Sequence, residues 1–213
     1  MMIKIILVDD HAVVRAGFRL LLTEALPNIE IVAEADQGEQ AIQLYQIHQP
    51  DIIIMDLSMP GIGGLEAIKR IIQRDESAKI LVFSVHDEQV YVHRALNAGA
   101  KGYITKNSAP EIMPEAIDNI LQGKTYVEQG LFKKNSGQTS THDYQKIIND
   151  FSEREFDIFR LLAKGLTAHK ISDELCLGYK TVANYVTQVK KKMYVSSVAE
   201  LAHIAIILGV MKH

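Results

Sequence analysis

Hydrophobic and polar residues follow two alternating patterns over the first 123 positions. Short apolar runs predict strands at residues 3–8, 29–34, 51–55, 79–84 and 100–104, and amphipathic segments predict helices at 11–25, 38–48, 64–73, 88–98 and 109–122. This alternation is typical of βαβ units, and the aliphatic run Ile52-Ile53-Ile54 suits a strand covered on both faces. The pattern therefore predicts a five-stranded, doubly wound parallel-sheet α/β domain.

The regular pattern fades after Gly123 and returns at Ser152. Residues 129–149 are mostly small and polar, so we expect a linker at 124–149 between domains at 1–123 and 150–213. Ser152 and Glu155 have the spacing of a helix-capping box. Four helices are predicted from there, at 152–164, 168–175, 179–193 and 197–208, which makes the second domain small and all-α.

Four apolar runs end on residues that can handle a phosphoryl group. Asp9 and Asp10 follow the first run, and later runs end at Asp56, Ser84 and Lys106. Since the carboxyl ends of parallel strands share one edge of a sheet, we expect one common site. Adjacent carboxylates repel unless a cation neutralises them, and all-oxygen ligands suit Mg²⁺. A carboxylate so screened can accept a phosphoryl group, although each residue alone is equally typical of a cap, a loop charge or a surface lysine.

The motifs around these residues are similar to those of the receiver domain of bacterial two-component response regulators. They are Asp9-Asp10-His11, Met55-Asp56-Leu57-Ser58-Met59-Pro60-Gly61, Ser84 and Gly102-Tyr103-Ile104-Thr105-Lys106. The resemblance covers about residues 1–123 and implies a flavodoxin-like fold. It also implies that a sensor histidine kinase donates the phosphoryl group to Asp56.

The same resemblance assigns the other residues their roles. Asp10, Asp56 and the backbone carbonyl of Ser58 would bind Mg²⁺, with Asp9 acting directly or through water, and Lys106 would contact the phosphoryl group. Ser84 would move to bond that group, which would let Tyr103 rotate inward. His86 and Ser58 occupy positions at which receivers tune the phosphoryl lifetime. One departure is Asn107, where receivers often have a proline preceded by a cis bond.

The predicted helix at 179–193 has an apolar face and an opposite, partly cationic face. The apolar positions are Val182, Val186, Val189 and Met193, and the cationic face carries Lys180, Asn184, Thr187 and Lys191. A solvated surface would explain that face. A short preceding helix, a turn at Gly178 and local positive charge favour instead a helix-turn-helix that offers its second helix to a major groove.

Residues 151–210 resemble the LuxR-type helix-turn-helix domain of NarL/FixJ-class regulators. The shared motifs are Ser152-Glu153-Arg154-Glu155, Leu162-Ala163-Lys164-Gly165, Ile171-Ser172-Asp173-Glu174-Leu175, Lys180-Thr181-Val182 and Val195-Ser196-Ser197. The resemblance implies phosphate contacts by Lys180, Thr181, Lys190 and Lys191, and base-edge contacts by Ala183, Asn184 and Thr187. Many members carry lysine at the position of Ala183. Within this class, short motifs most resemble the GacA/UvrY/LetA group.

The apolar stripe of the last predicted helix has two explanations. Val198, Leu201, Ile204, Ala205 and Leu208 form this stripe. It would cover the core of its own domain, and by family resemblance part of this helix would also form the contact of a homodimer on DNA. Monomer packing explains the stripe about as well, so the sequence leaves both open.

Charge and composition divide the chain in the same way as the motifs. Residues 1–150 carry 14 Lys and Arg against 20 Asp and Glu, whereas residues 151–213 carry 9 against 6. This division predicts an acidic and a basic domain with separate tasks. The single cysteine, Cys176, and the lack of an apolar stretch of membrane-spanning length predict a cytoplasmic protein that does not enter a membrane.

Together these features predict a phosphorylation-dependent regulator of transcription, not an enzyme. Its expected partners are a sensor histidine kinase, promoter sites on double-stranded DNA and a second copy of itself. One alternative is an Mg²⁺-dependent phosphatase with an aspartyl nucleophile, but adjacent Asp9 and Asp10 lack the usual spacing of two residues. The others are a constitutive DNA binder with an inactive receiver, and a flavin carrier, for which no residue set speaks.

Overall fold

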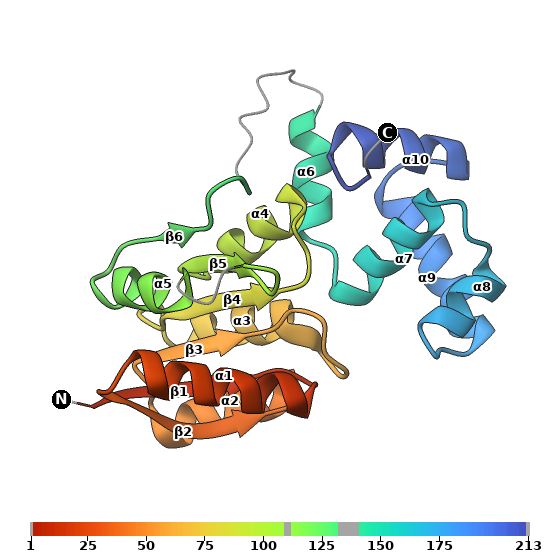
Figure 1. Cartoon of the computed structure of the whole chain (residues 1–213). Helices are drawn as coiled ribbons and strands as arrows, with labels where there is room; N and C mark the ends of the chain where they lie inside the picture. Colours follow the sequence, from red (N-terminus) through yellow and green to blue (C-terminus); the bar gives the residue numbers. More distant parts are fainter. Residues whose placement is uncertain (1, 109–111, 132–140, 212–213) are drawn as a thin grey trace. The chain divides into compact units, whose positions relative to one another are not determined.

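The computed structural model of this protein describes residues 2–108, 112–131 and 141–211 (Figure 1). The described residues form two compact units. The first contains the sheet and the helices that pack on it, and the second contains the helices that follow position 140. Each unit is described by itself.

The first unit is a parallel sheet in the order β2-β1-β3-β4-β5-β6. The strands are β1 Ile3–Val8, β2 Ile29–Ala35, β3 Ile52–Met55, β4 Ile80–Ser84, β5 Gly102–Thr105 and β6 Tyr126–Val127. The helices are α1 Ala12–Ala25, α2 Gly38–His48, α3 Gly63–Arg74, α4 Gln89–Asn97 and α5 Ile112–Leu121. The doubly wound α/β fold predicted from the hydrophobic pattern is confirmed.

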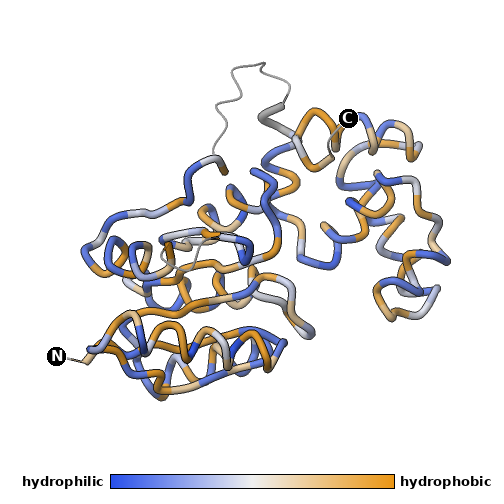
Figure 2. Tube along the Cα trace, in the orientation of Figure 1, coloured by the Kyte–Doolittle hydropathy of each residue, from blue (hydrophilic) through white to orange (hydrophobic). Residues whose placement is uncertain are grey.

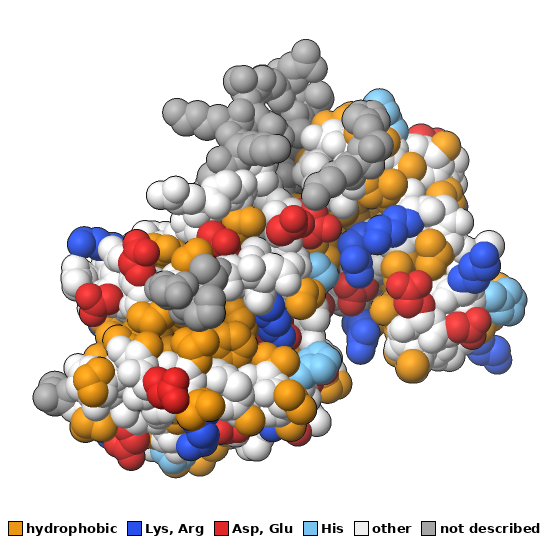
Figure 3. All heavy atoms as spheres, in the orientation of Figure 1, with side chains coloured by type: hydrophobic (Ala, Val, Ile, Leu, Met, Phe, Trp, Pro, Cys, Tyr) orange, Lys and Arg blue, Asp and Glu red, His pale blue; other side chains and the backbone are white. Residues whose placement is uncertain are grey.

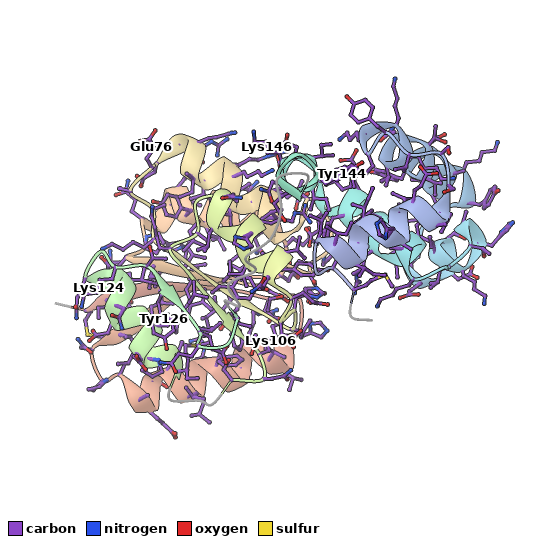
Figure 4. All side chains as sticks on the ribbon, turned by 90° about the horizontal axis from the view of Figure 1, so that it is seen from above. Glu76, Lys106, Lys124, Tyr126, Tyr144 and Lys146 are labelled. Atoms are coloured by element: carbon purple, nitrogen blue, oxygen red, sulfur yellow. The ribbon has the colours of Figure 1, made fainter. Side chains whose placement is uncertain are left out.

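The sheet has one strand more than predicted. β6 lies in the segment expected to be a linker, and it pairs Tyr126 with Gly102 and Val127 with Tyr103 at the edge of β5. Tyr126 is labelled on this edge in Figure 4. A strand of two half-buried residues is too short to produce a recognisable period, so the hydrophobic pattern could not reveal it.

Alternate residues of the strands face two separate cores. On one face Ile5, Leu7, Ile52, Ile54 and Phe83 pack with α1 and α5, which contribute Leu22, Met113, Ala116, Ile117 and Ile120. The intervening strand residues, such as Ile6 and Ile53, are fully buried on the opposite face. Figure 2 shows the resulting hydrophobic strands inside the unit. Burial on both faces explains why the strands are almost continuously aliphatic.

The strand order places a crevice beside β1. The chain leaves β1 for β2 on one side and then crosses to β3 on the other, so the connections after β1 and β3 diverge at their carboxyl ends. The start of α3 closes tightly against this edge. A Cβ atom on Gly64 would lie 1.9 Å from the carbonyl oxygen of Asp56, so only glycine allows this approach.

The second unit consists of five helices among the described residues. They are α6 Thr141–Asn149, α7 Glu153–Ala163, α8 Ala168–Glu174, α9 Tyr179–Lys192 and α10 Val198–Ile207. The last four match the predicted helices. α6 differs from the prediction, since residues 141–149 were expected to belong to the linker. Its sequence is mostly polar, and the buried side chain of Ile148 is too isolated a signal to show a helical period.

A buried carboxylate ties the start of α7 to the end of α9. The predicted capping box is present: the Ser152 hydroxyl accepts a hydrogen bond from the Glu155 amide, and the Glu155 carboxylate accepts one from the Ser152 amide. Lys192 Nζ lies 2.7 Å from Glu155 Oε1 and 5.6 Å from the ring centre of Phe151. Burial raises the pKa of Glu155, but the hydrogen bonds from Lys192 and Ser152 outweigh it and hold the pKa below its usual value.

Replacement of Gly64 by alanine should destabilise the first unit by about 1–3 kcal/mol, because the added methyl group meets the Asp56 backbone. The matched control is Gly17→Ala in α1, where an added Cβ meets nothing within 4 Å. That change should instead stabilise by about 0.5–1 kcal/mol. Urea unfolding of both variants measures the difference, and equal stability of Gly64→Ala and the parent protein would contradict the close approach.

The stability contributed by Glu155 should depend on pH. Because the pKa of this carboxyl is lowered in the folded protein, its contribution is complete above the ordinary value of 4.5 and is lost as the pH falls through the lower folded pKa. Denaturant unfolding of the parent and Glu155→Gln should therefore differ by about 1–3 kcal/mol at neutral pH and converge in acid. Exposed Glu174→Gln is the control, and a gap that stays constant with pH would contradict the ion pair's role.

Candidate functional site

The crevice at the carboxyl ends of β1 and β3 gathers three carboxylates and an imidazole. Asp9 and Asp10 follow β1, and Asp56 follows β3. One potential ligand atom from each of Asp9, Asp10, His11 and Asp56 lies within 4.8 Å of the others. Asp9 and Asp56 are buried, whereas Asp10 and His11 are open to solvent. The structure thus brings together the acidic residues singled out in the sequence, and it adds His11.

Lys106 supplies the positive charge at the centre of this cluster. Its Nζ lies 2.6 Å from Asp9 Oδ2 and 2.7 Å from Asp56 Oδ2, and Figure 4 labels it after β5. Burial lowers the pKa of Lys106, but hydrogen bonds to the two carboxylates raise it further, so the net shift is upward. Burial also raises the pKa of Asp56, and the ammonium group only partly offsets this. The lysine therefore stays charged and screens the acids from each other.

Backbone amides fix the side chain of Asp56. Its Oδ1 accepts hydrogen bonds from the amides of Leu57 at 2.7 Å and Ser58 at 3.4 Å, while Oδ2 contacts Lys106. The Asp56 amide itself donates to the carbonyl of Val8 at 2.8 Å, which aligns the ends of β3 and β1. The carboxylate is therefore held in one orientation, as a group that reacts at a defined position requires.

Asp9 is held by a second set of contacts. Its Oδ1 accepts a hydrogen bond from the His11 amide at 2.9 Å, and Arg15 binds its backbone carbonyl. Arg15 Nε also lies 3.1 Å from Glu34 Oε2 on β2. This chain of contacts from β2 through α1 supports the acidic pocket from behind.

His86 connects the candidate switch residues. Ser84 and Tyr103 are both fully buried. The His86 amide lies 3.4 Å from Ser84 Oγ, and the Tyr103 hydroxyl donates to the His86 carbonyl at 2.9 Å. The His86 ring lies 3.0 Å, through Nε2, from Ser58 Oγ, and it stacks on Tyr91 with ring centres 3.9 Å apart. Tyr103 thus occupies the inward position, and His86 covers the loop after Asp56.

Glu128 anchors the loop that carries Lys106, a role that no sequence motif indicated. Its Oε2 accepts hydrogen bonds from the Thr105 amide at 2.8 Å and from Ser108 Oγ at 2.6 Å. The peptide bond between Lys106 and Asn107 is trans, so the loop does not need the cis bond that a proline would favour. The missed residue lies directly after the missed strand β6, for the same reason.

The donor set fits a hard divalent cation. Oxygen ligands from three carboxylates suit Mg²⁺, which keeps several waters when it binds protein sites, and exposed Asp10 leaves room for them. Asp9, Asp10 and Asp56 are the side chains that could hold it. The backbone carbonyl of Ser58, expected as a further ligand, lies on the loop after Asp56.

The polar face of α9 is the candidate nucleic-acid surface of the second unit. Its fully buried residues Val182 and Val189 face the core. On the opposite side five of the seven predicted contact residues are exposed: Lys180, Thr181, Asn184, Thr187 and Lys191. Ala183 and Lys190 are half-buried. Figure 3 shows basic side chains gathered on the surface of this unit.

Two predicted contact residues already have partners within the unit. Lys190 Nζ donates to the Ser196 carbonyl at 3.0 Å, and Thr187 Oγ1 donates to the Ala183 carbonyl at 3.0 Å. The bond from Lys190 braces the turn between α9 and α10. Its ammonium group is therefore less available for a phosphate than those of Lys180 and Lys191.

The apolar stripe on α10 is mostly a core feature. Leu201, Ile204, Ala205 and Leu208 are buried, whereas Val198 is 37% exposed. Ile207, which is not part of the stripe, is 45% exposed. Among the residues that the structure describes, none of the helices is long and apolar enough to cross a bilayer.

Two family models match the chain. The response regulator receiver domain matches residues 5–118, and the luxR family of bacterial regulatory proteins matches residues 149–205. The first match contains Asp9, Asp56 and Lys106, and the second contains α7 to α9 and most of α10. The two matches therefore correspond to the two parts of the chain with candidate sites.

Known proteins are similar to the chain over nearly its full length. The transcriptional activator protein ExaE of Pseudomonas putida is 41% identical over 98% of each chain. The response regulator UvrY of Escherichia coli K12 is 36% identical over 96% of this chain and 94% of its own. Among solved structures, a LuxR-family two-component response regulator from Aurantimonas sp. SI85-9A1 is 42% identical with a TM-score of 0.59, covering 62% of this chain and 93% of that one.

Proposed function

We propose, since this chain belongs to the NarL/FixJ family of response regulators with a LuxR-type DNA-binding domain, that Asp56 is its phosphoryl acceptor. The protein is a phosphorylation-dependent, DNA-binding regulator of transcription. Its partners in this proposal are a sensor histidine kinase, promoter DNA and a second copy of the chain on that DNA, which places it in the cytoplasm. The observation that carries the assignment is the Lys106 ammonium group between Asp9 and Asp56.

In the transfer step a carboxylate oxygen of Asp56 forms a bond to phosphorus while the bond from phosphorus to the kinase histidine nitrogen breaks. The released imidazole keeps the electron pair. Lys106 attracts the phosphoryl oxygens and reduces the repulsion that the dianionic group would meet beside Asp9 and Asp10. Mg²⁺, held by Asp9, Asp10, Asp56 and the Ser58 carbonyl, supplies further neutralisation when bound. The amides of Leu57 and Ser58 keep the acceptor in place during this step.

The signal passes from Asp56 through the residues around His86. A phosphoryl group on Asp56 offers new acceptor oxygens to Ser84 Oγ, whose present neighbour is the His86 amide. A shift of Ser84 changes the backbone at His86, whose carbonyl holds the Tyr103 hydroxyl. The surface formed by α4, β5 and α5 then changes, and this surface controls dimerisation and DNA binding.

DNA binding is assigned to the exposed face of α9. Lys180, Thr181 and Lys191 contact phosphates, with a smaller part for Lys190, and Ala183, Asn184 and Thr187 lie nearest the base edges. Phosphate contacts provide affinity and base contacts provide sequence choice. A regulatory function is proposed in preference to an enzymatic one, since Asp9 and Asp10 are adjacent and lack the spacing of aspartyl phosphatases.

Replacement of Asp56 by asparagine should abolish the response of DNA affinity to acetyl phosphate. In the parent protein the donor should change the affinity for a bound promoter fragment by about tenfold, because typical coupling free energies amount to 1–3 kcal/mol. Fluorescence anisotropy with and without donor measures this, and exposed Asp36→Asn is the control. An undiminished response in Asp56→Asn would remove Asp56 from its role.

Two substitutions on α9 should have different effects on DNA binding. Lys180→Ala should weaken binding to all sequences and reduce its salt dependence by about one phosphate contact. Asn184→Ala should cost about 1–3 kcal/mol on the preferred site and little on random DNA. Lys124→Ala in the first unit controls for net charge. Identical losses on both DNAs for Asn184→Ala would contradict its contact with bases.

A further inference from the structure

We infer that His11 adds a nitrogen ligand to the acidic cluster, so that this site takes borderline transition ions such as Co²⁺ in preference to Mg²⁺. The inference rests on the metal site of the proposed function and goes further, because it assigns a residue and an ion selectivity. The acidic residues alone account for Mg²⁺. His11 is the one member of the cluster whose presence they leave unexplained.

The geometry places the imidazole at the mouth of the cluster. His11 Nδ1 lies 2.7 Å from Asp10 Oδ1 and 3.3 Å from Asp9 Oδ1. The four candidate ligand atoms lie within 4.8 Å of one another. Two ligands on opposite sides of one ion with bonds of about 2.1 Å are about 4.2 Å apart, so small side-chain rotations complete the set.

The backbone around His11 is fixed by other groups. The His11 amide donates to Asp9 Oδ1 at 2.9 Å, and the residue stands at the N-cap position of α1. Its side chain makes no capping hydrogen bond there. The usual local task of an N-cap side chain therefore does not explain where this imidazole lies, and its direction toward Asp10 needs another reason.

The chemistry of the donor set then determines which ion benefits. An imidazole nitrogen suits Co²⁺, Ni²⁺, Zn²⁺ and Cu²⁺, whereas Mg²⁺ prefers oxygen ligands and retains water. A site of three carboxylates and one imidazole therefore gains more affinity for the transition ions than for Mg²⁺. His11 makes this difference, and Asp10 contributes to both.

A purely positioning role for His11 is the competing explanation. In that role Nδ1–H donates a hydrogen bond to Asp10 and orients it, so its loss weakens every ion alike. In the ligand role Nδ1 carries a lone pair for the ion, so its loss weakens transition ions selectively. His11→Asn separates the two, since an amide can still donate to Asp10 but offers no imidazole nitrogen.

The experiment titrates the full-length protein with Co²⁺ and separately with Mg²⁺ by calorimetry, and follows the visible absorption of bound Co²⁺. His11→Asn should weaken Co²⁺ by about tenfold or more and alter its absorption spectrum, while Mg²⁺ affinity changes by less than about twofold. His48→Asn, at the end of α2, is the control for other histidines and should leave both ions unchanged.

Asp10→Asn distinguishes failure of this inference from failure of the proposed site. Weakening of both ions by Asp10→Asn supports the shared site, and unchanged binding of both overturns the site and the inference together. If Asp10→Asn weakens both ions but His11→Asn leaves Co²⁺ unchanged, or weakens Co²⁺ and Mg²⁺ equally, the site stands and the nitrogen-ligand assignment is wrong.

Discussion

The first unit depends on the contact of one ammonium group with two buried carboxylates. Asp9 and Asp56 are 5% and 3% exposed, and two such acids next to Asp10 would repel each other strongly without a cation. Lys106 reaches both of them. This contact brings the ends of β1, β3 and β5 into one electrostatic unit, and it is the same arrangement that a phosphoryl group needs on arrival. Stability and reactivity therefore have a common origin here.

Much of this site could be predicted from the sequence, because it uses strand ends. In a parallel sheet the carboxyl ends of neighbouring strands must meet, so runs ending at Asp9, Asp56 and Lys106 predict convergence without any coordinates. The helices of the second unit were predicted for a related reason. α9 has a strict apolar period through Val182 and Val189, and α7 begins with the capping pattern of Ser152 and Glu155.

The missed features are those that local pattern cannot encode. Glu128 reaches the Lys106 loop from 20 or more positions along the chain, and β6 is too short to show a period. Gly64 looks like an ordinary loop glycine until the backbone of Asp56 is found against it. The hydrogen bond of Lys190 to the turn after α9 is likewise invisible in a list of basic residues. Each of these depends on the three-dimensional approach of distant segments.

The most direct test of the account is to locate the phosphoryl group itself. The protein is treated with acetyl phosphate, with Mg²⁺ or with a chelator, and intact mass and peptide mapping count and place the modification. The account predicts one phosphoryl group for each chain, on Asp56, that forms only with the divalent ion. Modification at another residue, or equal modification in chelator, would contradict the claim that the screened carboxylate of Asp56 is the acceptor.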